Sequence, residues 1–431
     1  MRLKLIPEAI LKKEGVETST ISLKFNHLTP AVYQALQTLE EEPHFEDIEE
    51  LSCYYYYLDL LKKHGLIIYR TPLIELVPLN ANFLHEESPE GAYQLSRFAL
   101  CRSDNGELII ETPLSPLRVH LYNPDALPFF FALRKPLTLE EILKEFLHLP
   151  AEGVKETFSL LVSAKILTNG EESPNSRQWE FHDLFFHSRS REGRHNAPIG
   201  GTFRFKGAIP SQPAIKPCTQ KGIIELQKPE KTLTFSIEEA ILQRKSIRKH
   251  GEKPITLQQL EEFLYRCARV KKLFIREEEE FTSRPYPGGG SLYEFELYLV
   301  VYNCEGIKQG VYHYHPLAHQ LCNVSEFNSL AEKLLHDAKR SSAKEEYPQV
   351  LIVVSARFQR VFWKYQSMAY ALILKDLGVL IQTMYLVATA MELAPCAIGS
   401  GNSDLFCELI GTNYLEESSV GEFMLGSLPV A

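Results

Sequence analysis

The chain has 431 residues, a length that fits about two or three compact domains. Its apolar fraction of 45% and charged fraction of 23% are those of a globular protein with a substantial buried core. The net charge of −9 argues against general binding of polyanions such as nucleic acid. Most of that charge lies in residues 1–180, where 27 acidic side chains outnumber 17 basic ones.

Neither end nor middle of the chain predicts a membrane segment. The most apolar run, residues 377–391, has 15 residues and already contains Gln382, Thr383 and Thr389. The amino terminus lacks the basic and then apolar order of a signal peptide. The eight cysteines are scattered without a C-x-x-C pair, so structural zinc and a disulfide framework are both disfavoured. We expect a reduced, cytoplasmic protein with no membrane partner.

The first 180 residues repeat one order of elements, strands followed by three helices. Strands at 2–6 and 20–25 precede helices at 30–39, 45–51 and 54–64, and a strand at 66–69 follows. A hairpin at 92–101 and 107–111, turning at Asn105-Gly106, and a strand at 117–122 precede helices at 125–133, 138–147 and 151–165. This order predicts two winged-helix-like modules, residues 1–85 and 86–180.

The rest of the chain predicts a linker and a larger α+β domain. Residues 181–235 are rich in proline, glycine and serine and form the predicted linker. Residues 236–431 contain helices at 236–244 and 256–267, a long helical tract at 360–392 and a helix at 404–410. Strand patterns lie between them, at 295–303, 310–315, 350–356 and 421–426. Mixed helices and antiparallel-style strands are typical of an α+β fold.

Two common kinds of site are disfavoured by the motifs. The chain has neither a phosphate-binding P-loop nor a strand-anchored G-x-G-x-x-G sequence, so a nucleoside-triphosphate or dinucleotide site is unsupported. His313 and His315 share one face of a predicted strand, but no third ligand of fixed geometry accompanies them and Pro316 ends the strand. A hairpin without metal is the favoured interpretation.

Three short segments are candidates for a ligand site. Arg244, Lys245, Ser246 and Arg248 end a helix and could bind a phosphate, although a solvated helix end fits as well. The run Pro287, Gly288, Gly289, Gly290 and Ser291 could let the backbone approach a flat ligand, or form a flexible loop. Ile398, Gly399, Ser400 and Gly401 form a turn before a helix, where backbone amides could meet a phosphate or simply turn the chain.

Lys364 and Tyr365 stand together among aromatic residues at the start of the long helical tract. Both side chains can transfer protons, and burial shifts a lysine toward the neutral form. The plain alternative is one lysine reaching solvent beside one half-buried phenol. The residues alone leave both readings open.

Taken together, these motifs resemble the nitroreductase-like FMN family, and within it the SagB/McbC-type azoline dehydrogenases, most of all the cyanobactin oxidases. The resemblance covers residues 180–431 and rests on the order of the motifs around Arg244, Gly289, Tyr312, Lys364 and Gly399. It implies an antiparallel sheet flanked by helices, and a homodimer with FMN at the subunit interface. The two amino-terminal modules resemble winged-helix-like units that bind leader peptides.

The resemblance also implies roles for residues. FMN would be held by the segments already described and by Gln382, while Lys364 and Tyr365 would be catalytic, acting in proton transfer. The reaction would oxidise thiazoline or oxazoline rings of a heterocyclised, ribosomally made peptide, with molecular oxygen regenerating the flavin. The chain departs from the family at Gly288, where relatives have serine, and at Ala371 and Val379, where relatives often have arginine and histidine.

Two other functions compete with peptide oxidation. A generic NAD(P)H-dependent nitroreductase would share the flavin domain. A flavin-sensing DNA-binding regulator would explain the winged-helix appearance, but the candidate recognition helices at 54–64 and 151–165 are poor in arginine and lie in the acidic half. Nucleic acid is therefore not expected as a partner.

Overall fold

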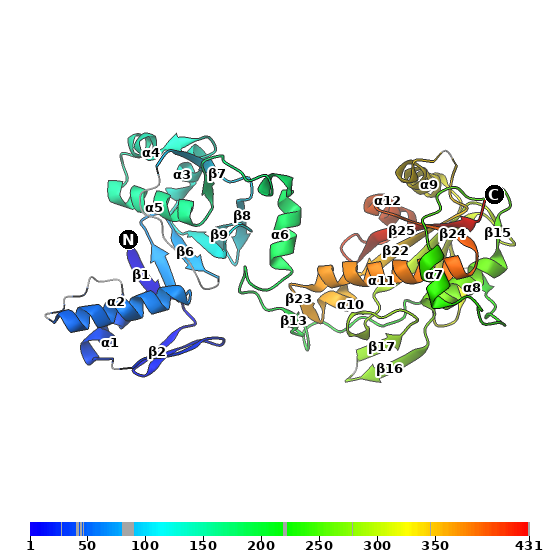
Figure 1. The fold of residues 1–431 in the computed structure, drawn as a ribbon, viewed down its shortest axis with the longest axis horizontal. Coiled ribbons are helices and arrows are strands. Elements are labelled where there is room, and N and C mark those ends of the chain that lie inside the picture. The colour runs from blue at the N-terminus through cyan, green and yellow to red at the C-terminus, as the bar shows by residue number, and fades with distance from the viewer. Residues whose placement is uncertain are drawn as a thin grey trace. The chain divides into compact units, whose positions relative to one another are not determined.

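The computed structural model describes residues 1–26, 28–39, 43, 45, 47–79, 90–218, 222–277, 279–344 and 346–429. The chain divides into two compact units, Met1–Ala197 and Pro198–Ala431, both drawn in Figure 1. Each unit has its own hydrophobic core. The predicted boundary between the two amino-terminal modules, near residue 85, lies outside the described residues.

A six-stranded sheet joins the two predicted modules of the first unit. Its central pairing is between β6 and β10, where Leu76 lies opposite Val119, so strands from both predicted modules share one sheet and one core. The division of this unit into two recognition modules stays a prediction. The strand order of the sheet is β1 (Arg2–Leu5), β5 (Ile67–Arg70), β6 (Glu75–Pro78), β10 (Leu117–Leu121), β9 (Glu107–Glu111) and β8 (Leu100–Asp104).

The helices of the first unit follow the apolar pattern, with differences at their ends. The predicted helices 45–51 and 54–64 form one helix, α2, which begins after the Asp47 cap because no breaker separates the two patterns. The predicted strand 92–101 is two strands, because a turn at 96–99 interrupts it. The helices are α1 (Pro30–Gln37), α2 (Ile48–Lys63), α3 (Ala126–Ala132), α4 (Leu139–Glu145), α5 (Ala151–Ser163), α6 (Phe181–Arg189) and the 3₁₀ turn η1 (Ser176–Gln178).

Short strands complete the first unit. The hairpin at Asn105-Gly106 is present, with φ of 50° and 87°, the left-handed pair that a tight turn needs. The expected linker begins inside this unit, since α6 lies within it and Arg189 forms an ion pair with the buried Glu111 at 2.6 Å. The remaining strands are β2 (Ile10–Lys12), β3 (Gly15–Glu17), β4 (Ser22–Lys24), β7 (Ala92–Leu95), β11 (Leu137–Thr138) and β12 (Leu167–Thr168).

A seven-stranded antiparallel sheet organises the second unit. Every neighbouring pair in it is antiparallel, as the α+β prediction required. The order is β14 (Ile223–Glu225), β21 (Gln320–Glu326), β20 (Gly310–His315), β18 (Phe295–Val301), β22 (Val350–Arg357), β25 (Glu417–Ser427) and β24 (Leu393–Ile398).

Helices cover both faces of this sheet because its strands are apolar on both sides. Leu297 and Leu299 pack on one face with α8 (Leu257–Ala268) and α11 (Ala369–Ala390), while Tyr298 and Val300 pack on the other with α9 (Ser329–Ser342) and α12 (Ser403–Ile410). Figure 1 shows α11 running along the sheet with α7 (Ile237–Gln243) beside it. The smaller elements are β13 (Gly200–Gly201), β15 (Ile255–Thr256), β16 (Lys272–Arg276), β17 (Glu279–Ser283), η2 (Gly289–Ser291), β19 (Cys304–Glu305), α10 (Phe358–Phe362) and β23 (Tyr365–Gln366).

Helix α11 corrects two expectations. The long helical tract begins at Ala369 rather than at 360, because α10 and β23 precede it. Its 22 residues, with a mean hydropathy of 1.6 in the most apolar window, are long and apolar enough to cross a membrane by length and composition. The prediction that no segment of the chain is long and apolar enough to cross a membrane is therefore wrong. Ile373, Leu380 and Met384 of this helix are fully buried in the core of the second unit, which accounts for much of its apolar character.

A disulfide corrects the expectation of a chain without bridges. Cys218 is bonded to Cys322 on β21, across a sequence separation of 104 residues. The sequence spacing of the cysteines could not predict this disulfide. The bond depends on where the segment before β14, which contains Cys218, meets the sheet.

Candidate functional site

The triple-glycine segment forms a tight turn that is held in place by helix α11. Gly290 has a φ of 62°, a left-handed conformation that costs a residue with a Cβ about 1–2 kcal/mol. The Gly289 N–H donates to the carboxylate of Asp376 on α11 at 2.7 Å. A Cβ on Gly289 would lie 2.6 Å from the Leu372 side chain, so the turn fits against the helix only without side chains. The segment is therefore a packed turn and not a flexible loop.

Lys364 and Tyr365 lie against this turn. Lys364 lies in the turn after α10 and Tyr365 begins β23, so neither is in the helix that the sequence predicted. A Cβ built on Gly290 would lie 2.6 Å from the Tyr365 hydroxyl and 3.1 Å from Lys364 Nζ. Two proton-transfer side chains thus converge on a backbone with no side chain. Burial, followed by the charge of Asp376, raises the pKa of Tyr365.

Behind the turn lies a buried charged cluster that sequence reasoning missed. Arg284 and Glu294 are 3% and 0% exposed, and Arg360 donates to the Leu292 carbonyl at 2.7 Å. Burial, with the nearby charge of Asp376, raises the pKa of Glu294 to about 8. The raised pKa favours the protonated form of Glu294 at neutral pH. The signal in the sequence was a glutamate directly before a mainly apolar strand, β18.

The Arg244–Arg248 segment meets strand β24. The Ile247 N–H donates to the Pro395 carbonyl at 2.8 Å. Ser246 and Tyr385 of α11 share a hydrogen bond of 2.8 Å between hydroxyls, and the same Tyr385 hydroxyl accepts from the Ala397 N–H at 2.8 Å. Tyr385, which no motif in the sequence singled out, thus joins the Arg244–Arg248 segment to β24, directly before the predicted segment Ile398–Gly401.

The cationic side chains of the Arg244–Arg248 segment remain available for a ligand. Arg244 is half-buried with its guanidinium 5.3 Å from the Tyr385 ring centroid, and Arg248 and Lys245 are exposed. None of the three forms an ion pair within the described residues. Cationic donors without carboxylate partners are what a phosphate needs.

The turn after β24 carries the remaining predicted residues. The hydroxyls of Ser400 and Ser341 of α9 are 2.7 Å apart. A Cβ on Gly401 would lie 2.2 Å from the carboxylate of Glu422, whose pKa burial raises to about 7. Gln382 is exposed on α11 and is not part of the hydrogen bonds that join the other residues.

Helix α11 contacts both the glycine turn and the Arg244–Arg248 segment. Asp376 holds the glycine turn and Tyr385 holds the Ser246 segment, nine positions apart, which is roughly 13.5 Å along a helix axis. That all these residues form one cofactor site stays a prediction.

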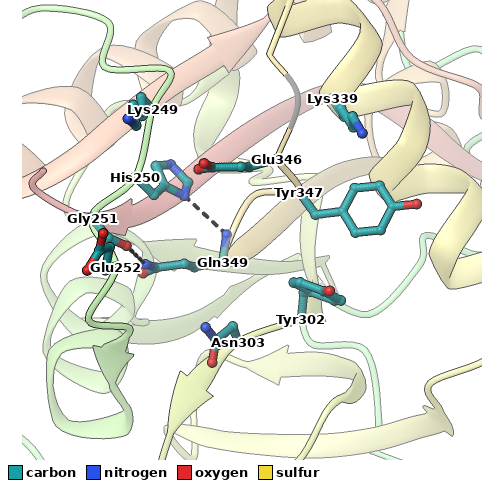
Figure 2. A pocket seen from close by; sticks show the side chains of 10 residues that line it. All are labelled: Lys249, His250, Gly251, Glu252, Tyr302, Asn303, Lys339, Glu346, Tyr347 and Gln349. Carbon is teal, nitrogen blue, oxygen red and sulfur yellow. Dashed lines mark hydrogen bonds between the residues drawn. The ribbon is translucent and has the colours of Figure 1, made fainter.

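A separate concavity of about 540 Å³ lies elsewhere in the second unit (Figure 2). Gln349 accepts backbone N–H groups of Ile255 and Ser427 through its side-chain oxygen, both at 3.0 Å. Its own N–H donates to Nδ1 of the buried His250 at 3.1 Å, drawn as a dashed line in Figure 2. Two lysines and two glutamates line the pocket, so their charges balance, and its buried members mainly join neighbouring segments.

The histidine pair occupies a hairpin. His313 and His315 lie on β20, which turns back into β21, and Nε2 of His313 is 2.8 Å from a carboxylate oxygen of Glu296. Burial alone would raise the pKa of Glu296, but Arg357 and His313 hold it at about 2. Within the described residues no group of three metal-ligating side chains is assembled.

Two family models match the chain. Residues 93–196 match the cyanobactin oxidase ThcOx, and residues 241–427 match the nitroreductase family. A protein of Methanocaldococcus jannaschii that is named as a nitroreductase is 24% identical over 180 residues, which are 41% of this chain and 84% of that protein. The second match contains every predicted site residue, from Arg244 to Gly401.

A relative from peptide processing is also similar. The microcin B17-processing protein McbC of Escherichia coli is 33% identical over 116 residues, 26% of this chain and 42% of McbC, so less than half of McbC is matched. The structure of the E. coli microcin synthetase McbBCD complex with truncated pro-MccB17 has a TM-score of 0.37 and 18% identity, covering 61% of this chain and all of that one. The chain is therefore a nitroreductase-like oxidoreductase in which a cyanobactin-oxidase-type region precedes the nitroreductase domain, as its motifs predicted.

Proposed function

We propose that this protein uses FMN to oxidise thiazoline or oxazoline rings of a ribosomally made peptide to thiazoles or oxazoles. The observation that carries the proposal is the convergence of Lys364 and Tyr365 on the bare backbone of Gly290. The matches to a cyanobactin oxidase and to a microcin-processing protein support a peptide rather than a free small molecule as substrate.

The residues present fit FMN in two respects. The glycine turn is a surface that a Cβ would fill, so a flat ring can approach its backbone. Arg244, Ser246 and Arg248, with Lys245 nearby, offer donors to the phosphate end, and the turn from Ile398 to Gly401 would complete it. Pro287 and Gln382 are proposed as further contacts. The cofactor would accept the hydride from the azoline ring.

The protein would supply the proton transfer. The hydrogen on the α-carbon of an azoline is acidic, and its removal accompanies loss of hydride from the neighbouring ring carbon, so the ring becomes aromatic. Because the pKa of Tyr365 is raised, its phenol keeps its proton at neutral pH. Tyr365 would act as a hydrogen-bonding partner, and we assign acceptance of the substrate proton to Lys364, whose Nζ lies beside Gly290. Asp376 would hold the turn, and with it the distance to both side chains.

A homodimer is proposed from the exposed apolar face of α7. Ile237, Ile241 and Leu242 are 68%, 58% and 77% exposed, on a helix that packs against α11. Such a patch marks an interface. A second copy of this chain would cover it and bring its own residues toward the flavin.

The first unit is proposed to hold the peptide. Its acidic balance suits a peptide with basic residues, and its sheet edges β1 and β8 could accept an added strand. Removing residues 1–197 should leave FMN bound to the second unit, which has its own core, but weaken binding of leader-bearing peptide in a fluorescence titration. Unchanged affinity would reject this role. Molecular oxygen is proposed as the final electron acceptor.

The decisive experiment is an absorption spectrum followed by anaerobic addition of a thiazoline peptide. The purified protein should be yellow, and the peptide should bleach the flavin band while a thiazole forms. Lys364→Ala should stay yellow and fail to bleach, whereas Lys375→Ala, an exposed lysine on α11, should behave as wild type. Loss of FMN from a folded Lys364→Ala variant would contradict the assigned role.

A generic nitroreductase is the second candidate, favoured by the match to the M. jannaschii relative over 84% of that protein. Rapid reduction of nitroarenes or quinones by NAD(P)H, with no bleaching by azoline peptides, would favour it over peptide oxidation.

A further inference from the structure

The first segment of the second unit, residues 198–218, is named here the strap because it runs along α10 and β23 in the opposite direction. Residues later in the strap contact residues earlier in the segment from Arg357 to Gln366. The backbone contacts are Gly200 with Gln366, Gly201 with Tyr365, the Ile209 carbonyl with Trp363 Nε1 at 2.6 Å, the Gln212 carbonyl with Arg360 Nη1 at 2.5 Å, and the Ala214 carbonyl with Arg357 Nη2 at 3.1 Å.

The strap is fastened at both ends. At one end β13 pairs with β23, and the Ser367 hydroxyl donates to the Pro198 carbonyl at 2.8 Å. At the other end Lys216 forms an ion pair with Glu417 at 2.5 Å, and Cys218 is bonded to Cys322. A segment with little regular structure of its own is therefore held along its whole length.

The strap delivers one aromatic ring to the candidate catalytic lysine. Phe203 has a φ of 52°, and its N–H donates to the Lys364 carbonyl at 3.1 Å. Its ring meets Trp363 edge-on, with centroids 5.9 Å apart. A left-handed backbone, a hydrogen bond and an aromatic contact together fix the position of this ring.

Three rings surround the Lys364 ammonium. Nζ lies 5.5 Å from the ring centroid of Phe203, 5.4 Å from that of Phe281 on β17, and 5.5 Å from that of Tyr365. Lys364 forms no ion pair with any described carboxylate. Aromatic faces attract a cation by about 0.5–2 kcal/mol each, depending on exposure. Aromatic rings are thus the groups that surround Nζ of this half-buried lysine.

We propose that the strap is a positioning element of this site, and that Phe203 acts with Phe281 to hold Lys364 beside Gly290. This inference rests on the proposed function, in which Lys364 becomes an ammonium when it takes the substrate proton. The ring faces fix the position of Nζ, so they keep it where the substrate carbon is to lie. Phe203 itself would touch neither FMN nor the reacting atoms and is a positioning residue.

The test uses the full-length holoenzyme with Phe203→Leu, which keeps an apolar side chain but loses the ring. Flavin reduction at saturating thiazoline peptide should slow about fivefold, the effect of one cation–π contact of about 1 kcal/mol. Affinities for FMN and peptide should not change. Phe203→Tyr, which keeps the ring, should restore the rate. Phe205→Leu is the matched control, because its ring faces Arg204 in the same strap. Phe281→Leu should slow the reaction as Phe203→Leu does.

A second readout does not depend on activity. The amine of Lys364 can be labelled with an acetylating reagent and followed by mass spectrometry, relative to the exposed Lys375. Phe203→Leu and Phe281→Leu should raise labelling of Lys364 severalfold, while Phe203→Tyr and Phe205→Leu should not. Altered labelling without any azoline oxidation by wild type would sink the proposed function and leave the strap's role intact. Wild-type labelling and rate in both leucine variants would overturn the strap proposal.

Discussion

The contact between Gly290 and the two proton-transfer side chains predicts the outcome of a single added methyl group. In Gly290→Ala, the left-handed φ of 62° costs about 1–2 kcal/mol of unfolding free energy. The new Cβ would lie 2.6 Å from the Tyr365 hydroxyl and 3.1 Å from Lys364 Nζ, whereas ordinary contacts begin at 3.4 Å. The hydroxyl must therefore retreat by about 0.8 Å, and a displacement near 1 Å can cost up to about 100-fold in rate.

Stopped-flow reduction of the bound flavin by a thiazoline peptide measures this effect. Gly290→Ala should stay yellow and reduce about 10- to 100-fold more slowly. The control is Gly411→Ala, because Gly411 has a φ of 71° but nothing within 4 Å of an added Cβ. This variant is therefore destabilised only by the left-handed backbone conformation. Adding Tyr365→Phe to Gly290→Ala should recover stability, because the clashing oxygen is gone. A Gly290→Ala enzyme that reduces at the wild-type rate would refute the placement of these side chains.

Three further predictions test the second unit. Burial raises the pKa of Glu294 to about 8, so its stabilising contribution is full below its ordinary pKa of 4.5 and is lost as pH rises through 8. Glu294→Gln should therefore gain stability relative to wild type between pH 5 and pH 9 in urea unfolding; an equal difference at both would contradict this. Cys218→Ser should lower the free energy of unfolding by about 2–4 kcal/mol, and dithiothreitol should bring wild type to the same value. If the proposed homodimer forms through α7, Ile241→Glu should convert it to a monomer in sedimentation, and an unchanged mass would exclude α7 from the interface.

Local signals in the sequence predicted the helices α7, α8 and α12 and the strands β18, β20, β22 and β25 of the second unit, but not α9 or β21. The strands β18, β20 and β22 follow largely apolar or aromatic runs, and the capping boxes at Ser236 and Thr256 lie at the starts of α7 and α8. The nitroreductase fold was predicted from the order of short motifs, and the match over residues 241–427 agrees with it. Periodicity failed where elements follow one another without a breaker, as in the tract before α11.

The candidate site could be predicted only in part, because its residues are joined by contacts between distant segments. Motifs identified Gly290 and Lys364 separately, but their proximity depends on Asp376 holding the turn from α11. Tyr385 lies within the predicted helical tract and belongs to no motif, and only the fold shows that it meets Ser246. Such partners carry no local pattern, since a hydrogen bond across 139 positions leaves periodicity unchanged.

The strap is a further segment whose long-range contacts its sequence pattern does not predict. Its composition, rich in proline and glycine, is typical of a connector, and the sequence analysis treated it as one. Yet a connector needs no arginine contacts along its length, and the strap has them from Arg357 and Arg360, both buried. Burying two guanidiniums is costly unless their donors are used, and here the carbonyls of the strap use them. The strap is therefore part of the folded unit, and its removal would take from each arginine a carbonyl to which it donates.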